Sequence, residues 1–404
     1  MFAAMMTIHK LTSGTGYTYL TRQIAGGDVP RQAGQSAADY YTAQGNPPGQ
    51  WIGRGAPLLD LHEQTVTGSQ MRHLFGLGQH PEADRIIEAY LAANVRADVS
   101  DHQLEAVRTA AIDAAKLGRA FPQYQALAPF EGRVAQRLAT HMEQARRDPT
   151  RAEVKKIQRE ESTRQRAAVA GFDVVFAPVK PAAVLWALDD RENVRAAVRQ
   201  AHEAARDAAF ELLEEHAAFT RTGSTGQAQI ETKGLIAAAF DHYDSRAGDP
   251  NLHTHVAVSS KVQGVDGKWR SLDARALYAM TAAASEFYNS RFEVELSGRL
   301  GVTFTDRPST SGREPVREIT GVPGEFITHF SSRRTEIEAR YEQLLRTYRA
   351  EHGRDPSKGV AHQLARQANL DTREGKKAAR RWPRCARHGA DRSRTPSAPR
   401  LFSA

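Results

Sequence analysis

The chain has 404 residues, 40% of them hydrophobic and 25% charged, a composition typical of a globular protein with a sizeable core. Its apolar runs, such as that over 235–240, are far shorter than the ~20 residues that a membrane-spanning helix needs. The apolar start over 1–6 is too short for a secretory signal, and the single cysteine, Cys385, excludes an internal disulfide and a cysteine-based zinc site. We therefore expect a cytoplasmic protein without membrane insertion.

The formal net charge of +8 lies entirely at the C-terminal end of the chain. Residues 376–404 contain nine lysines and arginines against one acidic residue, Asp391, whereas residues 1–375 contain 46 basic and 46 acidic residues. The basic balance therefore does not identify a partner for the folded part, and DNA binding has to be argued from a site. The stretch 381–404 is rich in Arg, Ser and Pro with almost no aliphatic residues, which predicts a basic, disordered tail.

Two changes of pattern divide the remaining chain. Residues 7–55 are rich in Gly, Thr and Tyr and have few helix signals, and from 60 to 166 apolar residues recur at helical spacing. Residues 171–176 then alternate, with Phe172, Val174 and Phe176 on one face, which predicts a strand. The later predicted elements are strands over 234–242 and 252–262, a tight turn at 266–267, a β-like stretch over 301–305, and helices over 182–219, 273–300, 325–350 and 360–379.

The strongest chemical signal is the sequence His253-Thr254-His255. Residues two apart on a strand project from the same face, so both imidazoles point the same way. His242 ends the preceding predicted strand, and Asp249-Pro250-Asn251 offers a turn, so an antiparallel return would place His242 beside the other two. Three imidazoles from two strands predict a metal site with open coordination positions, as in catalytic sites. The alternative is three unrelated histidines among the 15 in the chain.

Asp173 occupies the polar face of the strand predicted over 171–176. A carboxylate there can orient a metal-bound histidine through its second ring nitrogen, or accept a proton from a nucleophile. Spacing alone favours a solvated residue on a half-exposed strand.

Two tyrosine clusters precede the helical region. Tyr17 and Tyr19 flank Thr18, and Tyr40-Tyr41 follow. Tyrosines in such segments most often pack against a core. A phenol placed next to a metal that polarises a phosphate would, however, supply the components of covalent phosphodiester chemistry.

Together these residues resemble a known family. The histidine segments are Phe240-Asp241-His242-Tyr243-Asp244-Ser245-Arg246, Asp249-Pro250 and Leu252-His253-Thr254-His255. They are similar to the three-histidine motif of MobF-type conjugative relaxases, the TrwC/TraI-like group of HUH-type nucleases. Tyr17-Thr18-Tyr19, Asp39-Tyr40-Tyr41, the W-x-G-x-G-A segment at 51–56 and the strand at 171–176 are similar to further segments of that family, in the same order from about 6 to 380.

The resemblance implies a role for each residue. Tyr17 would be the nucleophile that cleaves one DNA strand and keeps a covalent 5′-phosphotyrosine, and Tyr19 its neighbour or substitute. The cluster is Tyr-Thr-Tyr where the family has adjacent tyrosines. Either Tyr17 or Tyr19 could therefore be the nucleophile that attacks first. Tyr40 and Tyr41 would serve a second strand transfer, and Asp173 would orient a histidine or help deprotonate the tyrosine. The set that would hold a divalent metal, Mg, Mn or Zn, is His242, His253 and His255.

The resemblance also implies the fold and the partners. The fold would be α+β, a palm-like antiparallel sheet covered by helices, with a relaxase domain over 1–380 that includes a helical insertion at about 60–166. The expected partners are single-stranded DNA at an origin of transfer with its adjacent hairpin, relaxosome accessory proteins and a type IV secretion coupling protein. The chain lacks the G-x-x-x-x-G-K-[ST] loop of the family's helicase part, so we expect the relaxase part alone, cut short.

Two other functions fit part of the pattern. A three-histidine metalloenzyme acting on a small molecule, a hydrolase or a cupin-like oxygenase, would use the histidines but leave the tyrosines and Asp173 idle. An inactive, truncated DNA-binding remnant would agree with Pro181-Ala182-Ala183, which stand where the family has Ser-Val-Ser and remove two hydroxyls that could cap a helix or touch a phosphate.

Overall fold

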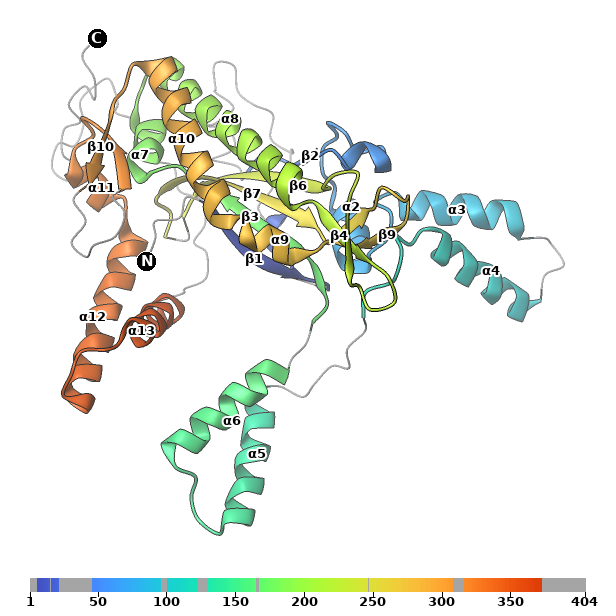
Figure 1. Cartoon of the computed structure of the whole chain (residues 1–404), viewed down its shortest axis with the longest axis horizontal. Helices are drawn as coiled ribbons and strands as arrows, with labels where there is room; N and C mark the ends of the chain where they lie inside the picture. The colour runs from blue at the N-terminus through green and yellow to red at the C-terminus, as the bar shows by residue number, and fades with distance from the viewer. Residues whose placement is uncertain are drawn as a thin grey trace, which may run out of the picture. The chain divides into compact units, whose positions relative to one another are not determined.

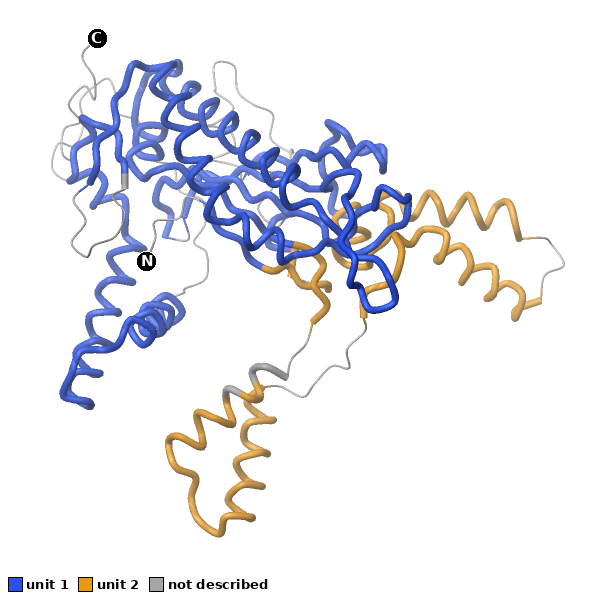
Figure 2. The backbone as a smooth tube through the Cα atoms, in the orientation of Figure 1, with its two compact units in different colours: residues 1–9, 18–68, 172–404 blue, residues 10–17, 69–171 orange. Residues whose placement is uncertain are grey.

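The computed structural model describes residues 6–14, 16–21, 46–95, 100–122, 130–164, 167–245, 247–307 and 316–372. Tyr40, Tyr41 and the predicted tail over 381–404 lie outside these residues. The chain divides into two compact units (Figure 2): unit 1 comprises 1–9, 18–68 and 172–404, and unit 2 comprises 10–17 and 69–171. The proposed relaxase domain over 1–380 with its insertion stays a prediction.

Helices and strands occur in blocks along the described parts of the chain, with a run of helices before the strand at 169–176 and a run of strands over 219–271. Up to residue 176 they are β1 (Met6–Thr12), the 3₁₀ turn η1 (Thr18–Leu20), β2 (Gln50–Ile52), the 3₁₀ turn η2 (Ala56–Leu59), α2 (Gly68–Met71), the π-helical turn η3 (Arg72–Leu77), α3 (Ala83–Asn94), α4 (Asp101–Ala114), α5 (Phe130–Ala145), α6 (Arg151–Arg164) and β3 (Val169–Phe176). After it they are α7 (Lys180–Leu188), α8 (Glu192–Ala217), β4 (Phe219–Thr222), β5 (Ala228–Glu231), β6 (Ala237–Asp244), β7 (Pro250–Ser259), β8 (Lys261–Gln263), β9 (Trp269–Ser271), α9 (Ala274–Ala279), α10 (Thr281–Leu300), β10 (Phe304–Arg307), β11 (Val316–Ile319), α11 (Gly324–His329), α12 (Ser332–His352) and α13 (Lys358–Asp371).

A five-stranded sheet in the order β1-β3-β7-β6-β2 carries the central strands. β6 pairs antiparallel with β7 and with β2, and the strand predicted over 171–176 is present as β3. Three further pairs, β4-β5, β8-β9 and β10-β11, form two-stranded antiparallel sheets. The predicted α+β class with an antiparallel sheet covered by helices is confirmed.

Helices α8 and α10 lie side by side across the sheet of unit 1 (Figure 1). α8 buries a stripe of alanines four residues apart, at 197, 201, 205 and 209, whereas α10 buries Tyr288, Phe292 and Leu296 at the same spacing. Small side chains on α8 leave room for large ones on α10, so the two helices pack closely. α7 is buried almost all round, as its apolar sequence predicts.

The single helix predicted over 182–219 is wrong. The structure has two helices, because α7 ends at Leu188 and α8 begins at Glu192. The Asp189 carboxylate accepts hydrogen bonds from the Arg191 backbone N–H at 2.9 Å and from the Arg191 guanidinium at 2.8 Å. These local hydrogen bonds compete with the backbone hydrogen bonds that would continue the helix, and aspartate side chains commonly form such alternatives. The helix predicted over 273–300 also divides in two, at Met280.

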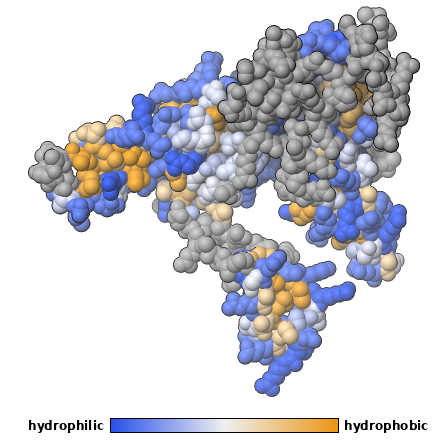
Figure 3. Space-filling view, turned by 180° about the vertical axis from the view of Figure 1, so that it is seen from behind, coloured by the Kyte–Doolittle hydropathy of each residue, from blue (hydrophilic) through white to orange (hydrophobic). Residues whose placement is uncertain are grey.

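Unit 2 is mainly helical, as predicted for 60–166. Its hairpin of α5 and α6 is held by a buried ion pair in which Arg133 Nε lies 3.0 Å from a carboxylate oxygen of Glu161. Apolar side chains gather over α3 and α4 (Figure 3), where Ile112 is 43% exposed. Within the described residues, every helix is too short or too polar to cross a bilayer.

The W-x-G-x-G-A segment at 51–56 packs its backbone against the start of β6. Gly53 has φ +99°, and a Cβ on it would lie 2.4 Å from the Leu235 carbonyl oxygen, so only glycine fits there. The buried Glu214 of α8 joins the two segments, because its Oε1 accepts the backbone N–H groups of Arg54 and Leu235, each at 2.8 Å. This carboxylate therefore fixes β2 and β6 at the edge of the sheet.

We expect Glu214→Ala to lower the free energy of unfolding by about 2–3 kcal/mol, because it leaves two backbone donors without an acceptor. Glu215→Ala is the matched control, since that side chain is 63% exposed and a change there should stay within about 0.5 kcal/mol. Denaturant unfolding of both variants measures the difference. Equal decreases in the free energy of unfolding for the two variants would show that the Glu214 hydrogen bonds do not stabilise the contact between the β2 segment and the start of β6.

Candidate active site

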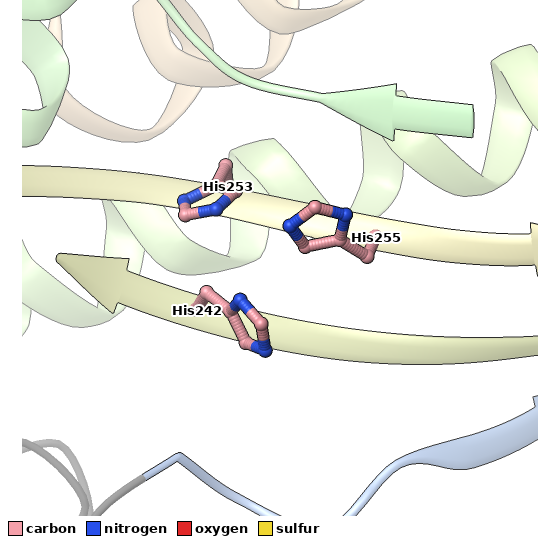
Figure 4. Close-up of side chains that lie close together, drawn as sticks. All are labelled: His242, His253 and His255. Carbon is pink, nitrogen blue, oxygen red and sulfur yellow. The ribbon is translucent and has the colours of Figure 1, made fainter. Parts of the chain in front are cut away.

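The predicted antiparallel return of the histidine strands is confirmed. His242 on β6 is the register partner of His253 on β7, and His255 lies two residues further along the same face. The three imidazoles point toward one another (Figure 4), with ring centroids 4.8–5.3 Å apart and potential ligand nitrogens all within 4.8 Å. The two strands therefore bring the predicted histidine set into one cluster.

Hydrogen bonds fix which nitrogen two of these rings present. His253 Nδ1 lies 2.7 Å from the Asn251 carbonyl oxygen and 3.1 Å from the Asn251 side-chain nitrogen; because a carbonyl oxygen can only accept, the shorter contact requires Nδ1 to donate. His255 Nδ1 donates to the Asp173 carboxylate at 2.8 Å. Each Nδ1 thus carries the proton, and each Nε2 keeps its lone pair for a metal ion. Three imidazole donors suit a divalent transition metal or zinc and leave coordination positions open. The donor set therefore fits a catalytic metal.

Asp173 is 2% exposed, so the interpretation as a solvated surface residue is wrong. β3 lies between β1 and β7 in the sheet, and its polar face is turned toward the histidines rather than toward water. The carboxylate accepts hydrogen bonds from two groups: His255 Nδ1 and the hydroxyl of Tyr19. One carboxylate thus contacts both a potential metal ligand and a potential nucleophile.

Tyr19 lies on η1, and of the two tyrosines of the first cluster, which the structure describes, it is the one that contacts Asp173 and His255. Its ring meets the His255 ring edge-on, with centroids 5.7 Å apart, and the residue remains 39% exposed. A phenol that is held at one end by a carboxylate and still open to solvent can be reached by a large substrate. Its position therefore suits a nucleophile.

Tyr17, only two residues earlier, has different surroundings within unit 2. Its ring packs at 6.2 Å from Phe75, and a Cβ on Gly76 would lie 2.9 Å from its hydroxyl oxygen. Tyr17 is 6% exposed, and burial raises the pKa of its phenol. Deprotonation of Tyr17 is therefore more costly than that of an exposed tyrosine.

Two residues near the site were not predicted to take part in it, although Asn251 was expected in a turn and lies in β7 instead. Asn251, whose carbonyl orients His253, stands two positions before it on the same strand, a spacing that could have indicated the contact. Lys180 begins α7, and its ammonium donates to the Pro250 carbonyl oxygen at 2.6 Å, while burial lowers the pKa of Lys180 to about 8. Pro181 follows in the first turn, and Val179 precedes the helix without a side-chain cap, so this helix forms without the two missing hydroxyls.

Comparison with known proteins identifies the family. A profile described as TrwC relaxase matches residues 13–393, nearly the whole chain. The chain belongs to the TrwC relaxase family. The match includes the histidine strands, Asp173 and both tyrosine clusters, so the TrwC-family resemblance found in the motifs holds for the sequence as a whole.

Relatives of this TrwC-family chain are much longer than it is. The multifunctional conjugation protein TraI of Escherichia coli is 27% identical over 227 residues, which are 52% of this chain and 12% of that protein. TraI of Escherichia coli strain K12 is 27% identical over 168 residues, 39% of this chain and 9% of that protein. The chain thus aligns with a small part of the relatives it matches.

Solved structures agree with the TrwC-family fold. The conjugative relaxase TrwC in complex with oriT DNA, in a metal-bound structure, superimposes with a TM-score of 0.53 at 20% identity over 92% of each chain. A copper-bound structure of the same relaxase with oriT DNA gives a TM-score of 0.55 at 20% identity over 93% of each chain. The two share the α+β fold with this chain along almost its entire length.

Proposed function

We propose that this protein is a conjugative relaxase, which nicks one strand of plasmid DNA at an origin of transfer through a covalent 5′-phosphotyrosine. The observation that carries the proposal is the contact of one buried carboxylate, Asp173, with both the Tyr19 hydroxyl and His255 Nδ1. A nucleophile, a base and three potential metal ligands thereby meet in a single site. A three-histidine enzyme for small molecules would have no use for this tyrosine.

The contacts in the site support a particular sequence of steps. The Tyr19 oxygen attacks the scissile phosphorus while its proton passes to the Asp173 carboxylate. The new bond joins phosphorus to the tyrosine oxygen, the bond from phosphorus to the DNA 3′ oxygen breaks, and that oxygen leaves as a 3′ hydroxyl after it gains a proton. His242, His253 and His255 would hold a divalent cation, which would supply polarisation of the phosphate. One phosphodiester replaces another, so the step is reversible and a second strand can be joined.

The remaining partners belong to the same proposal. The DNA would be single-stranded around the nick and would carry a hairpin beside it, and Tyr40 or Tyr41 would carry out a second transfer. The metal would be Mg, Mn or Zn. Relaxosome accessory proteins and a type IV secretion coupling protein would deliver the complex from the cytoplasm. These assignments follow from family membership.

The test is a covalent adduct on DNA. The protein is mixed with Mn²⁺ and a pool of random-sequence single strands, labelled at the 3′ end and long enough to contain a hairpin and a nick site. We expect a labelled, SDS-resistant protein band that protease removes, because the 5′ phosphate of the labelled fragment stays on the tyrosine. Sequencing the captured strands should give one nick site. Binding of the pool without any adduct would instead support an inactive remnant.

A further inference from the structure

A buried polar network lies on the opposite face of the histidine strands. Thr254 separates His253 from His255 and points away from them, and its register partner on β6 is Asp241, the residue before His242. The Thr254 hydroxyl lies 2.5 Å from an Asp241 carboxylate oxygen, and Thr254 is fully buried. Thr254 and Asp241 thus link the two strands on the face opposite the histidines. Thr254 is adjacent in sequence to His253 and His255, and Asp241 is adjacent to His242.

His202 of α8 connects this pair to the helical layer. Its Nε2 lies 2.8 Å from Thr254 Oγ1, and its Nδ1 lies 2.7 Å from the hydroxyl of Tyr288 on α10. His202 is 1% exposed and Tyr288 is fully buried. Burial lowers the pKa of His202 well below its usual value and raises that of Tyr288, so both side chains are neutral near pH 7.

The chemistry of these groups allows one direction for the hydrogen bonds. The Asp241 carboxylate can only accept, so the Thr254 hydroxyl donates to it and its oxygen is left to accept from His202 Nε2–H. His202 Nδ1 then has no proton and accepts from the Tyr288 hydroxyl. Asp241 Oδ1, which accepts from Thr254, also lies 3.5 Å from Arg206 Nη1 at the end of this chain of hydrogen bonds. The Thr254 hydroxyl and the His202 ring thus each donate one hydrogen bond and accept one within the network.

We propose that Thr254 and His202 are positioning residues for the three-histidine site. The network anchors β7 to α8 and α10 at the residue between two of the imidazoles, and it anchors β6 at the residue before the third. Loss of the Thr254 hydroxyl leaves the His202 N–H without a partner and removes one donor from Asp241 Oδ1, so the strand can shift to restore these hydrogen bonds. Because metal binding needs all three rings at once, small shifts weaken it. This inference rests on the proposed role of the histidines as metal ligands.

The experiment titrates Co²⁺ into the purified full chain and follows the visible absorption of the bound ion. Thr254→Val, which removes the hydroxyl but keeps the shape, should weaken Co²⁺ binding about 10- to 100-fold and change the spectrum. Thr254→Ser, which keeps the hydroxyl, should restore binding to within a few-fold of the wild type. Thr220→Val is the matched control: Thr220 is also fully buried, and its hydroxyl donates to the Ser271 carbonyl oxygen at 2.7 Å in a different sheet.

Each outcome decides between roles. If Thr254→Val and Thr220→Val lose similar thermal stability but only the former loses Co²⁺ affinity, the positioning role is supported. If Thr254→Val binds Co²⁺ as the wild type does, the inference is overturned. If the wild type itself does not bind Co²⁺, the metal role in the proposed function fails instead. Should Thr254→Val not fold, Tyr288→Phe, which removes the far end of the network, should weaken binding at least about three-fold, and unchanged affinity would overturn the inference.

Discussion

Tyr19→Phe should abolish the covalent protein–DNA adduct, a loss of about 10³-fold or more, whereas Tyr17→Phe should retain it. The substitution at 19 removes the one oxygen that contacts Asp173 and leaves the ring against His255. Tyr17 is buried against Phe75 in unit 2, and burial raises its pKa, so its phenol is the weaker candidate. Adduct formation with the selected oligonucleotide, followed by peptide mapping, measures the difference.

The two substitutions control for each other, because each removes a single hydroxyl and keeps an aromatic ring. Fluorescence anisotropy should show that both variants bind the uncleaved oligonucleotide as the wild type does. Mapping the nucleotide to Tyr17 would restore the assignment implied by the order of the motif. Mapping it to Tyr40 or Tyr41 would place the first attack in the second cluster and contradict the proposed role of Asp173 as the base for Tyr19.

Chelation of divalent metals, or His255→Ala, should abolish cleavage while the melting temperature changes by only a few degrees. The fold does not depend on these imidazoles, because β6 and β7 pair along their length and bury apolar residues such as Phe240 and Val256. Oligonucleotide cleavage and thermal unfolding of the same samples measure the two effects.

His62→Ala is the control, since the His62 side chain is 62% exposed and the substitution removes the same imidazole elsewhere. It should leave both cleavage and melting temperature unchanged. A melting temperature that falls by more than about 10 °C on chelation would make the site structural, as in domains that fold only with metal.

The histidine cluster could be predicted because only local information was needed. The two-residue spacing of His253 and His255 fixes their common face, and the turn predicted at 249–251 indicates the return of the chain past His242. Both follow from the period of a strand. The structure places that reversal slightly earlier, between Ser245 and Asp249, because residues 250 and 251 already belong to β7. The helical nature of 60–166 and the strand at 171–176 could be predicted for the same reason.

The contacts of Asp173 could not be predicted from its spacing, because they are long-range; the family resemblance alone implied that Asp173 orients a histidine or helps to deprotonate a tyrosine. Strand periodicity shows which face a side chain occupies, but it does not show what covers that face. Tyr19 is 154 residues away in sequence, and only the tertiary fold places its hydroxyl on the Asp173 carboxylate. Likewise the spacing of Tyr17 and Tyr19 carries no sign that the chain passes from one compact unit to the other between them.

The pairing of β2 with β6 limits how early the central sheet can be completed while the chain is being synthesised. β2 ends at Ile52 and its partner begins at Ala237, so about 185 residues separate two strands that must lie side by side. At ~5–20 residues per second, a ribosome needs ~10–40 s to synthesise that interval. The tyrosine clusters exist as peptide throughout this interval and Asp173 exists for about its last third, but the three histidines have not yet been synthesised. We therefore expect the three-histidine cluster and its contact with Asp173 to form late, after β6 and β7 have emerged from the ribosome.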